Sequence, residues 1–123
     1  MAKSVHADVL DGALAVVSTH ASKMVALASQ PASFAAATSG ALAGVAMAPA
    51  DFALAAGAVS GRKLTVAAKS AIAVSASGSA THVALLDETL SRLLYVTTCP
   101  ATALTAGGTV NFGAWAIELA DPA

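Results

Sequence analysis

The first part of the chain carries apolar residues at helical spacing. Within residues 5–21, VHADVLDGALAVVSTHA, the apolar positions 9, 10, 13, 14, 16 and 17 recur at intervals of one, three and four. This spacing indicates one stripe of an amphipathic helix. Asp8 and His20 have the charges that favour the two ends of a helix dipole. We therefore expect one short N-terminal helix over about residues 5–21, although Gly12 weakens it.

After Ser22 the chain changes to short runs of β-branched and apolar residues that glycine, proline, serine and asparagine interrupt, which is typical of strands. Between residues 32 and 60 the alanine-rich sequence has no clear period, and helix, strand and irregular structure all fit it. Ser39, Gly40, Pro49 and Gly57 favour short strands and loops there. The expected strands are KMVALAS (23–29), FAAAT (34–38), ALAGVAM (41–47), DFALAAG (51–57), RKLTVAA (62–68), AIAVSAS (71–77), ATHVALLD (80–87), RLLYVTTC (92–99) and TVNFGAWAIELA (109–120).

The second half of the chain suggests how these strands connect. Segments 62–68, 71–77 and 80–87 are separated by two- or three-residue joints, which favours an antiparallel meander. In the last segment the apolar residues change parity around Gly113, which predicts a bulge or corner where the strand crosses between sheets. We expect a mainly β fold, an antiparallel β-sandwich or jelly-roll-like barrel with one short N-terminal α-helix, as a single domain over residues 1–123.

Composition and charge exclude several classes of function. The formal net charge is −1, from six Lys and Arg against seven Asp and Glu, so nothing attracts nucleic acid. The most apolar run is mostly alanine and glycine and is broken by Pro49 and Asp51, so no membrane span is expected. Asp8 and Asp11 interrupt any secretory signal pattern, which suggests a protein made for the cytosol. An alanine-rich core buries little area, and a partner subunit would help to stabilise it.

Reactive side chains gather in residues 79–99, SATHVALLDETLSRLLYVTTC. His82, Asp87, Ser91, Tyr95 and Cys99 all lie within this segment. We interpret it as a β-hairpin whose polar turn residues satisfy their own backbone. Cys99 would lie near residues 80–82 across the ladder, so a Cys and His pair is conceivable. The pattern marks no orienting third group and no oxyanion site, so we expect no catalytic residue.

Other candidate groups also favour structural roles. The three histidines, at positions 6, 20 and 82, lack the spacing of zinc ligands, and we expect no metal and no cofactor. Arg62 and Lys63 follow Gly61 and are interpreted as solvated charges at the start of a strand, with a role as partner contacts as the alternative. Trp115 and Tyr95 are expected to anchor the core.

Several segments resemble a group of small virion-associated proteins of tailed bacteriophages. They are VHADVLDGAL (5–14), SGRKLTVAAKS (60–70), SGSATHVALLD (77–87), RLLYVTTC (92–99), LTAGGTVNF (104–112) and AWAIELADP (114–122). The resemblance covers most of the chain apart from residues 32–56. It implies a non-enzymatic part of the virion with no catalytic residues, and small β-rich proteins of this kind often serve as capsid decoration or cement proteins.

We therefore expect a capsid decoration protein on the virion surface, made in the host cytoplasm, whose partners are the major capsid protein and itself, as a dimer or trimer. The alternative is a neck, tail or head-fibre-base protein. A small thiol enzyme built on His82 and Cys99, and a ligand-binding barrel with a pocket of about 300 Å³ or more, are the alternatives from other classes. The candidate contact residues are Val5, Val9, Leu10, Phe34, Met47, Phe52, Arg62 and Lys63.

Overall fold

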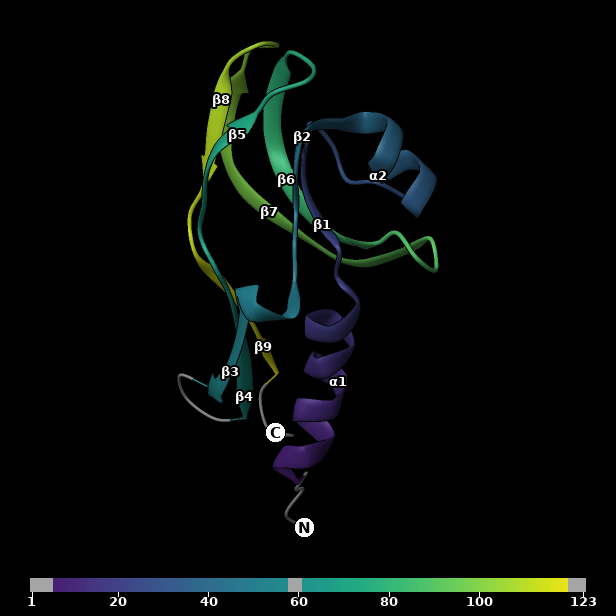
Figure 1. Cartoon of the computed structure of the whole chain (residues 1–123), viewed down its shortest axis with the longest axis vertical. Helices are drawn as coiled ribbons and strands as arrows, with labels where there is room; N and C mark the ends of the chain where they lie inside the picture. The colour runs from purple at the N-terminus through teal and green to yellow at the C-terminus, as the bar shows by residue number, and fades with distance from the viewer. Residues whose placement is uncertain (1–5, 58–60, 120–123) are drawn as a thin grey trace.

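The computed structural model describes residues 6–57 and 61–119 of the 123-residue chain. Its elements are α1 Ala7–His20, β1 Lys23–Leu27, α2 Phe34–Gly40, β2 Ala41–Ala46, the 3-10 turn η1 Pro49–Asp51, β3 Phe52–Ala56, β4 Arg62–Val66, β5 Lys69–Ala73, β6 Gly78–Asp87, β7 Arg92–Leu104, β8 Thr109–Phe112 and β9 Trp115–Leu119. The molecule is elongated, with α1, β3, β4 and β9 at one end and α2, β5 and β8 toward the other (Figure 1).

The strands form antiparallel sheets that share one core. A four-stranded sheet has the order β2-β1-β6-β7, a three-stranded sheet has the order β3-β4-β9, and β5 pairs with β8. Met24 and Leu85 from the first sheet, Leu64 from the second and Phe112 from β8 are buried in the same apolar cluster. The predicted mainly β fold with an N-terminal helix is therefore confirmed, and the sheets pack across their core as in a sandwich.

The central strands β1 and β6 are buried on both faces. Met24 of β1 and Leu85 of β6 belong to the main core, whereas their neighbours Val25 and Leu86 belong to a second, smaller cluster that Ala37 of α2 covers. All five side chains are at most 1% exposed. Because side chains alternate along a strand, a strand covered on both sides has no polar face.

Helix α1 begins with a side-chain cap and packs by one face. The ring Nδ1 of His6 accepts a hydrogen bond from the backbone N–H of Asp8 at 3.1 Å. Asp8 lies in the first turn, where its negative charge suits the dipole, and His20 lies in the last turn. Leu14 and Val17 are buried, and the helix contacts β3, β4 and β6. No helix within the described residues is both long enough and apolar enough to cross a membrane.

The alanine-rich segment 34–40 is helical, whereas the sequence pattern favours short strands and loops there. The helix α2 begins after Ser33, whose Oγ accepts a hydrogen bond from the backbone N–H of Ala36 at 3.2 Å. Alanine has the highest helix propensity, and Ala37 is buried against the outer face of the four-stranded sheet. The serine and glycine that were interpreted as interruptions lie at its last two positions. The expectation of strands is right for β2 and β3 and wrong for α2.

The strands β4, β5 and β6 do not form the predicted meander. The strand β4 pairs with β3 and β9, β5 pairs with β8, and β6 pairs with β1 and β7. After β4, the backbone N–H of Ala67 donates to the carbonyl of Asp51, and Lys69 Nζ lies 2.7 Å from Asp51 Oδ1. These contacts hold the joint against η1, so the chain continues into another sheet instead of reversing. A two-residue joint is compatible both with a hairpin and with a crossing into another sheet. The apolar faces that become buried decide which strands pair.

The predicted corner at Gly113 is confirmed. The strand β8 ends at Phe112 and β9 begins at Trp115, and these strands pair with β5 and β4 respectively. Phe112 and Ile117 are buried in the same core although they are five positions apart. An unbroken strand would place residues at an odd separation on opposite faces. The change of apolar parity therefore marks the crossing between sheets.

Replacing Leu85 by alanine should destabilise the fold strongly. Leu85 is 0% exposed, so Leu85→Ala leaves a cavity in the main core, and we expect the free energy of unfolding to fall by about 2–5 kcal/mol. Urea denaturation measures this loss. The control is Leu54→Ala on β3, where the side chain is 41% exposed and the expected loss is below about 1 kcal/mol. Equal losses in the two variants would contradict the assignment of the core.

Candidate functional site

Residues 79–99, where reactive side chains gather, lie in β6 and β7, and residues 88–91 make the turn of this hairpin. The register pairs His82 with Thr98. Cross-strand partners share a face of the sheet. Thr98 is exposed, whereas the next residue, Cys99, packs against the main core. His82 and Cys99 therefore project toward opposite faces and do not form the conceivable nucleophile and base pair.

The thiol of Cys99 is in surroundings that suppress its reactivity. Cys99 does lie beside residues 80–82 as predicted, with Sγ 3.9 Å from the carbonyl oxygen of Ala80. Burial raises the pKa of the Cys99 thiol above its usual value. The thiolate is the nucleophilic form, so a raised pKa lowers the reactive fraction at neutral pH. Nearby, His82 Nδ1 lies 2.8 Å from Thr81 Oγ1 and is engaged locally.

Asp87 is a buried carboxylate that organises the hairpin turn. Its side chain is 1% exposed, and its Oδ2 accepts hydrogen bonds from Arg92 Nη2 at 2.8 Å and Arg92 Nε at 3.1 Å. Its Oδ1 accepts hydrogen bonds from the backbone N–H groups of Thr89 and Leu90. The hydrogen bonds from Arg92 hold the pKa of Asp87 below its usual range, against the opposing effect of desolvation. The prediction that this turn satisfies its own backbone is confirmed.

The same turn is joined to the end of α1. His20 Nδ1 lies 4.0 Å from Asp87 Oδ2. Ser22 Oγ accepts a hydrogen bond from the backbone N–H of Glu88 at 3.0 Å, and the backbone N–H of Ser22 donates to the carbonyl of Leu86 at 2.8 Å. Ser22, Glu88 and Asp87 therefore connect the end of the helix to the hairpin.

The three histidines lie in separate surroundings. His6 caps α1, His20 approaches Asp87, and His82 contacts Thr81. Among residues 6–57 and 61–119 no group of three or more His, Cys, Asp and Glu side chains is placed to hold a metal ion.

Arg62 is not the solvated charge that the sequence suggested. Its Nε donates to Asp11 Oδ1 at 2.8 Å, and the two side chains are 28% and 30% exposed. The pair joins α1 to the start of β4, because packing of the helix brings Asp11 over that strand. Lys63 is also partly buried and lies opposite Glu118 of β9 in the register.

The candidate contact residues of the N-terminal segment differ in exposure. Val5 lies outside the described residues. Val9 is 62% exposed on α1, whereas Leu10 is partly buried. Val9 therefore retains the exposure that a contact residue needs.

The three candidate contact residues of the alanine-rich region are not freely exposed. Met47 is 7% exposed and belongs to the main core, which corrects its interpretation as a surface contact. Phe34 is partly buried against the second cluster, and Phe52 is partly buried against the main core. Most of the buried residues of the main core are leucine, valine, methionine, isoleucine or phenylalanine, and four of the eighteen are alanine.

Three exposed apolar residues were missed. Val16 is 42% exposed, Leu54 41% and Leu90 59%. For Val16 a signal existed, because adjacent helix positions are about 100° apart and Val16 and Val17 cannot both face the core. For Leu54 and Leu90 no local pattern carried the information, since their exposure depends on which neighbours cover β3 and the hairpin turn.

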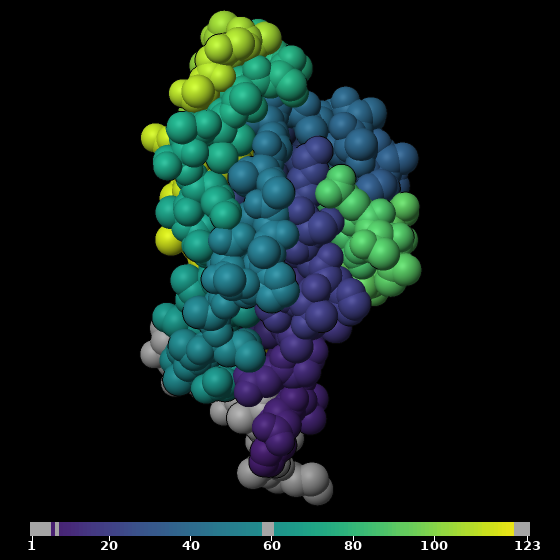
Figure 2. Space-filling view, viewed as in Figure 1, coloured from purple at the N-terminus to yellow at the C-terminus, as the bar shows by residue number. Residues whose placement is uncertain are grey.

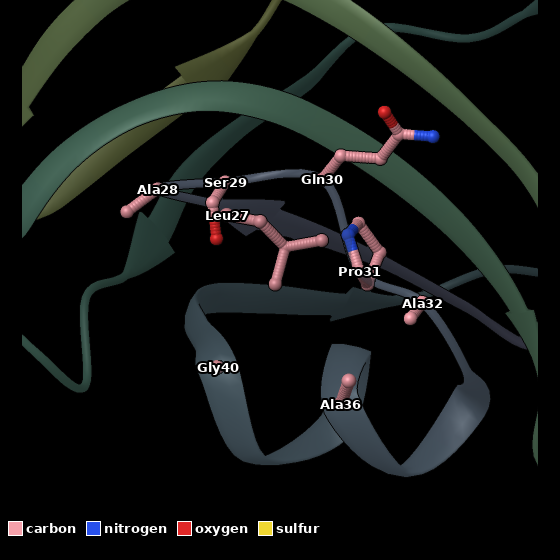
Figure 3. A pocket seen from close by; sticks show the side chains of 8 residues that line it. All are labelled: Leu27, Ala28, Ser29, Gln30, Pro31, Ala32, Ala36 and Gly40. Atoms are coloured by element: carbon pink, nitrogen blue, oxygen red, sulfur yellow. The ribbon is translucent and has the colours of Figure 1, made fainter.

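A hollow of about 370 Å³ lies between α2 and the segment that follows β1 (Figure 3). Leu27 and Pro31 lie on the side that faces α2, whereas the side chain of Gln30 turns away. The lining residues are Leu27, Ala28, Ser29, Gln30, Pro31, Ala32, Ala36 and Gly40. The volume is within the range of small-molecule pockets. The lining carries no acid, base or metal ligand, so the hollow can accept an apolar group but offers no titratable side chain for catalysis.

Tyr95 and Trp115 connect the two larger sheets. Their rings are stacked, with centroids 5.8 Å apart and planes 27° apart, and both pack against the main core. This confirms the expectation that they anchor the core. Trp115 Nε1 is buried and has no hydrogen-bond partner among the described residues.

Taken together, these contacts leave apolar surface as the strongest candidate for function. The polar residues of the hairpin and of β4 hold elements together, whereas Val9, Val16, Leu54 and Leu90 remain substantially exposed. No family model, no curated protein and no solved structure matches this chain.

The lowered pKa of Asp87 predicts a loss of stability in acid. A carboxyl whose pKa is depressed by folding stabilises the fold above its unfolded pKa of about 3.9, and this stabilisation is lost as the pH falls through the folded pKa. We expect Asp87→Asn to be less stable than the wild type at pH 7 and to show a smaller loss on acidification, measured by urea denaturation from pH 7 to pH 2.

Asp51 provides the comparison for this experiment. The hydrogen bond from Lys69 lowers the pKa of Asp51, so part of the acid sensitivity remains in Asp87→Asn. Asp51→Asn should remove the part of the acid sensitivity that Asp51 contributes. If Asp87→Asn and the wild type lose stability equally on acidification, the ion pair with Arg92 does not contribute as described.

The raised pKa of Cys99 predicts slow alkylation. We expect iodoacetamide to modify native Cys99 at pH 7 more slowly than it modifies free cysteine, and the urea-unfolded chain to react at the rate of free cysteine. Mass spectrometry at timed intervals measures both rates. A native rate above that of free cysteine would show an activated thiol and return the enzyme hypothesis to consideration.

Proposed function

We propose that this chain is a non-enzymatic structural protein of a tailed-bacteriophage virion. Most specifically, we propose a capsid decoration protein that binds the lattice of the major capsid protein on the capsid surface and stabilises the head. The observation that carries the proposal is the set of large apolar side chains left exposed on a β-rich body, because they favour a role in docking.

The exposed apolar residues support docking on energetic grounds. Val9 and Leu90 are 62% and 59% exposed, and Val16 and Leu54 about two fifths. Single exposed apolar residues are common on soluble proteins, but burying them against a partner gains about 25 cal/mol per Å². Several such contacts spread over one small subunit suit a protein that works by covering another surface.

The use of the polar residues supports a non-enzymatic role. The carboxylate of Asp87 is occupied by Arg92 and by the hairpin turn, and Cys99 has a raised pKa. Arg62 is paired with Asp11. A catalytic site usually combines a pocket with titratable groups of perturbed pKa, whereas these groups lie outside the hollow beneath α2.

Stabilisation of the head follows from linkage. A protein that binds the mature lattice, and not the precursor or the free capsid subunits, shifts the equilibrium toward the mature shell. A dimer or trimer that touches several capsid subunits at once gains from effective concentration, so contacts of modest area combine into durable attachment.

The copy number of the chain in purified particles tests the proposal. We expect a ratio to the most abundant coat protein of one, or a simple fraction such as a third, measured by quantitative mass spectrometry. About six or twelve copies per particle would instead indicate a neck, tail or head-fibre-base protein. Absence from purified particles would overturn a virion role altogether.

Head stability provides the functional control. Particles that lack this chain should release their DNA at a lower temperature than complete particles, and added purified protein should restore the wild-type value. Particles lacking the chain that are as heat-stable as complete particles would contradict a cementing role even if the copy number were high.

A further inference from the structure

The outward face of α1 is apolar along two turns. Val9 and Val16, seven positions apart, are 62% and 42% exposed, and the exposed residues Gly12 and Ala13 lie between them. Residues seven apart lie almost in line on a helix, so these four form one stripe. The helix stands at one side of the molecule, and in the space-filling view its first turns project beyond the body (Figure 2).

Gly12 has no explanation within the described part of the chain. Glycine disfavours a helix interior more than any residue except proline. A Cβ at Gly12 would meet nothing within 4 Å, whereas a Cβ at Gly78 would lie 3.2 Å from Leu42. The positive backbone φ angles of described glycines occur at Gly61 and Gly107, so the conformation of Gly12 does not require glycine either. A close approach by another chain would require it.

We propose that this face binds a second copy of the chain through an antiparallel, two-fold symmetric pairing of α1 with α1. With the axis beside the middle of the helix, Val16 of each copy lies over the notch left by the partner subunit's Gly12. A two-fold axis makes the contact twice, as in any isologous interface. Each copy therefore presents both a projecting side chain, Val16, and an open position, Gly12, so that two antiparallel copies fit each other.

Charge selects the antiparallel direction and a second copy as the occupant. Asp8 stands at the N-terminal end of the stripe and His20 at its C-terminal end. Within one chain Asp8 Oδ2 lies 3.5 Å from His6 Nδ1, and His20 Nδ1 lies 4.0 Å from Asp87 Oδ2. Reversal adds the partner subunit's His20 to the surroundings of Asp8, and it opposes the two helix dipoles favourably. A parallel pairing would place the two N-terminal ends, each with Asp8, side by side.

The hairpin turn extends the same contact. Leu90 lies in the turn between β6 and β7 and is 59% exposed, and Ser22 joins this turn to the end of α1 through Glu88. Figure 1 shows the hairpin projecting beside the upper end of α1, away from β3 and β4. An antiparallel partner brings its first helical turn to this end, so the partner subunit's Val9 approaches the turn that carries Leu90.

The size of the contact predicts its strength. The helix α1 has 14 residues and is about 21 Å long, so one face buries less than the roughly 800 Å² per partner of a standard interface. The dimer should therefore be weak and should form at high protein concentration. The pairing does not depend on a role in the virion.

Analytical ultracentrifugation of the purified chain, from micromolar to millimolar concentration, tests the pairing. We expect the wild type to shift from monomer to dimer over this range and Val16→Lys to remain monomeric. The matched control is Leu54→Lys, because Leu54 and Val16 are 41% and 42% exposed and Leu54 lies on β3. A wild type that stays monomeric throughout, or a Leu54→Lys variant as impaired as Val16→Lys, overturns the proposal.

Gly12→Ala separates pairing from folding. The methyl group should raise the midpoint of thermal unfolding of the dilute monomer, because alanine favours the helix, and should lower the dimer association constant several-fold. Unchanged association in Gly12→Ala would contradict the close approach at this position.

Disulfide trapping tests the direction of the helices. In a Cys99→Ser background, chains carrying Gly12→Cys and chains carrying Val16→Cys are mixed and oxidised at high concentration. We expect the mixed disulfide between the two kinds of chain to dominate. Predominance of disulfides between identical chains would overturn the antiparallel arrangement, while the copy number in particles would still decide the proposed function separately.

Discussion

The double-sided burial of β1 and β6 is the constraint on which the rest of the structure depends. Leu85 belongs to the main core between the sheets, and its neighbour Leu86 belongs to the smaller cluster that contains Ala37 of α2, because adjacent strand residues face opposite ways. Neither layer alone would shield this pair of strands from water. The main core and the small cluster beneath α2 are therefore two consequences of one apolar run, VALL (83–86), near the end of β6.

Ion pairs fix the arrangement around this centre. Each joins a carboxylate to a cation on another element or across the hairpin turn, and three of the chain's six Lys and Arg residues are used in this way. The pairs are Asp11 with Arg62, Asp51 with Lys69, and Asp87 with Arg92. Ion pairs near a surface add little stability, but they discriminate between alternative placements of α1, of the β4–β5 joint and of the hairpin. Charged residues make up 11% of the chain.

Local periodicity explains which parts of the fold could be predicted. The helical spacing before Ser22 and the parity change at Gly113 were visible because each lies within a dozen or so residues. The helix at 34–40 was not visible, because alanine gives no periodic contrast and its placement depends on Ala37 meeting β1 and β6. Strand pairing across sheets was also hidden. At the candidate site, hairpin register placed Cys99 beside Ala80, but its raised pKa depends on burial, which is a tertiary property.

The corner at Gly113 has a consequence for folding during synthesis. One short segment, residues 109–119, supplies a hydrogen-bonding partner to β5 through β8 and to β4 through β9. The paired residues of both partners lie 36 to 57 positions earlier in the chain, so these edges stay open on the ribosome until the segment emerges. Pairings between such distant residues form slowly, and open strand edges invite aggregation in the interval. Completion of the fold is thus timed by the translation of a single stretch of sequence.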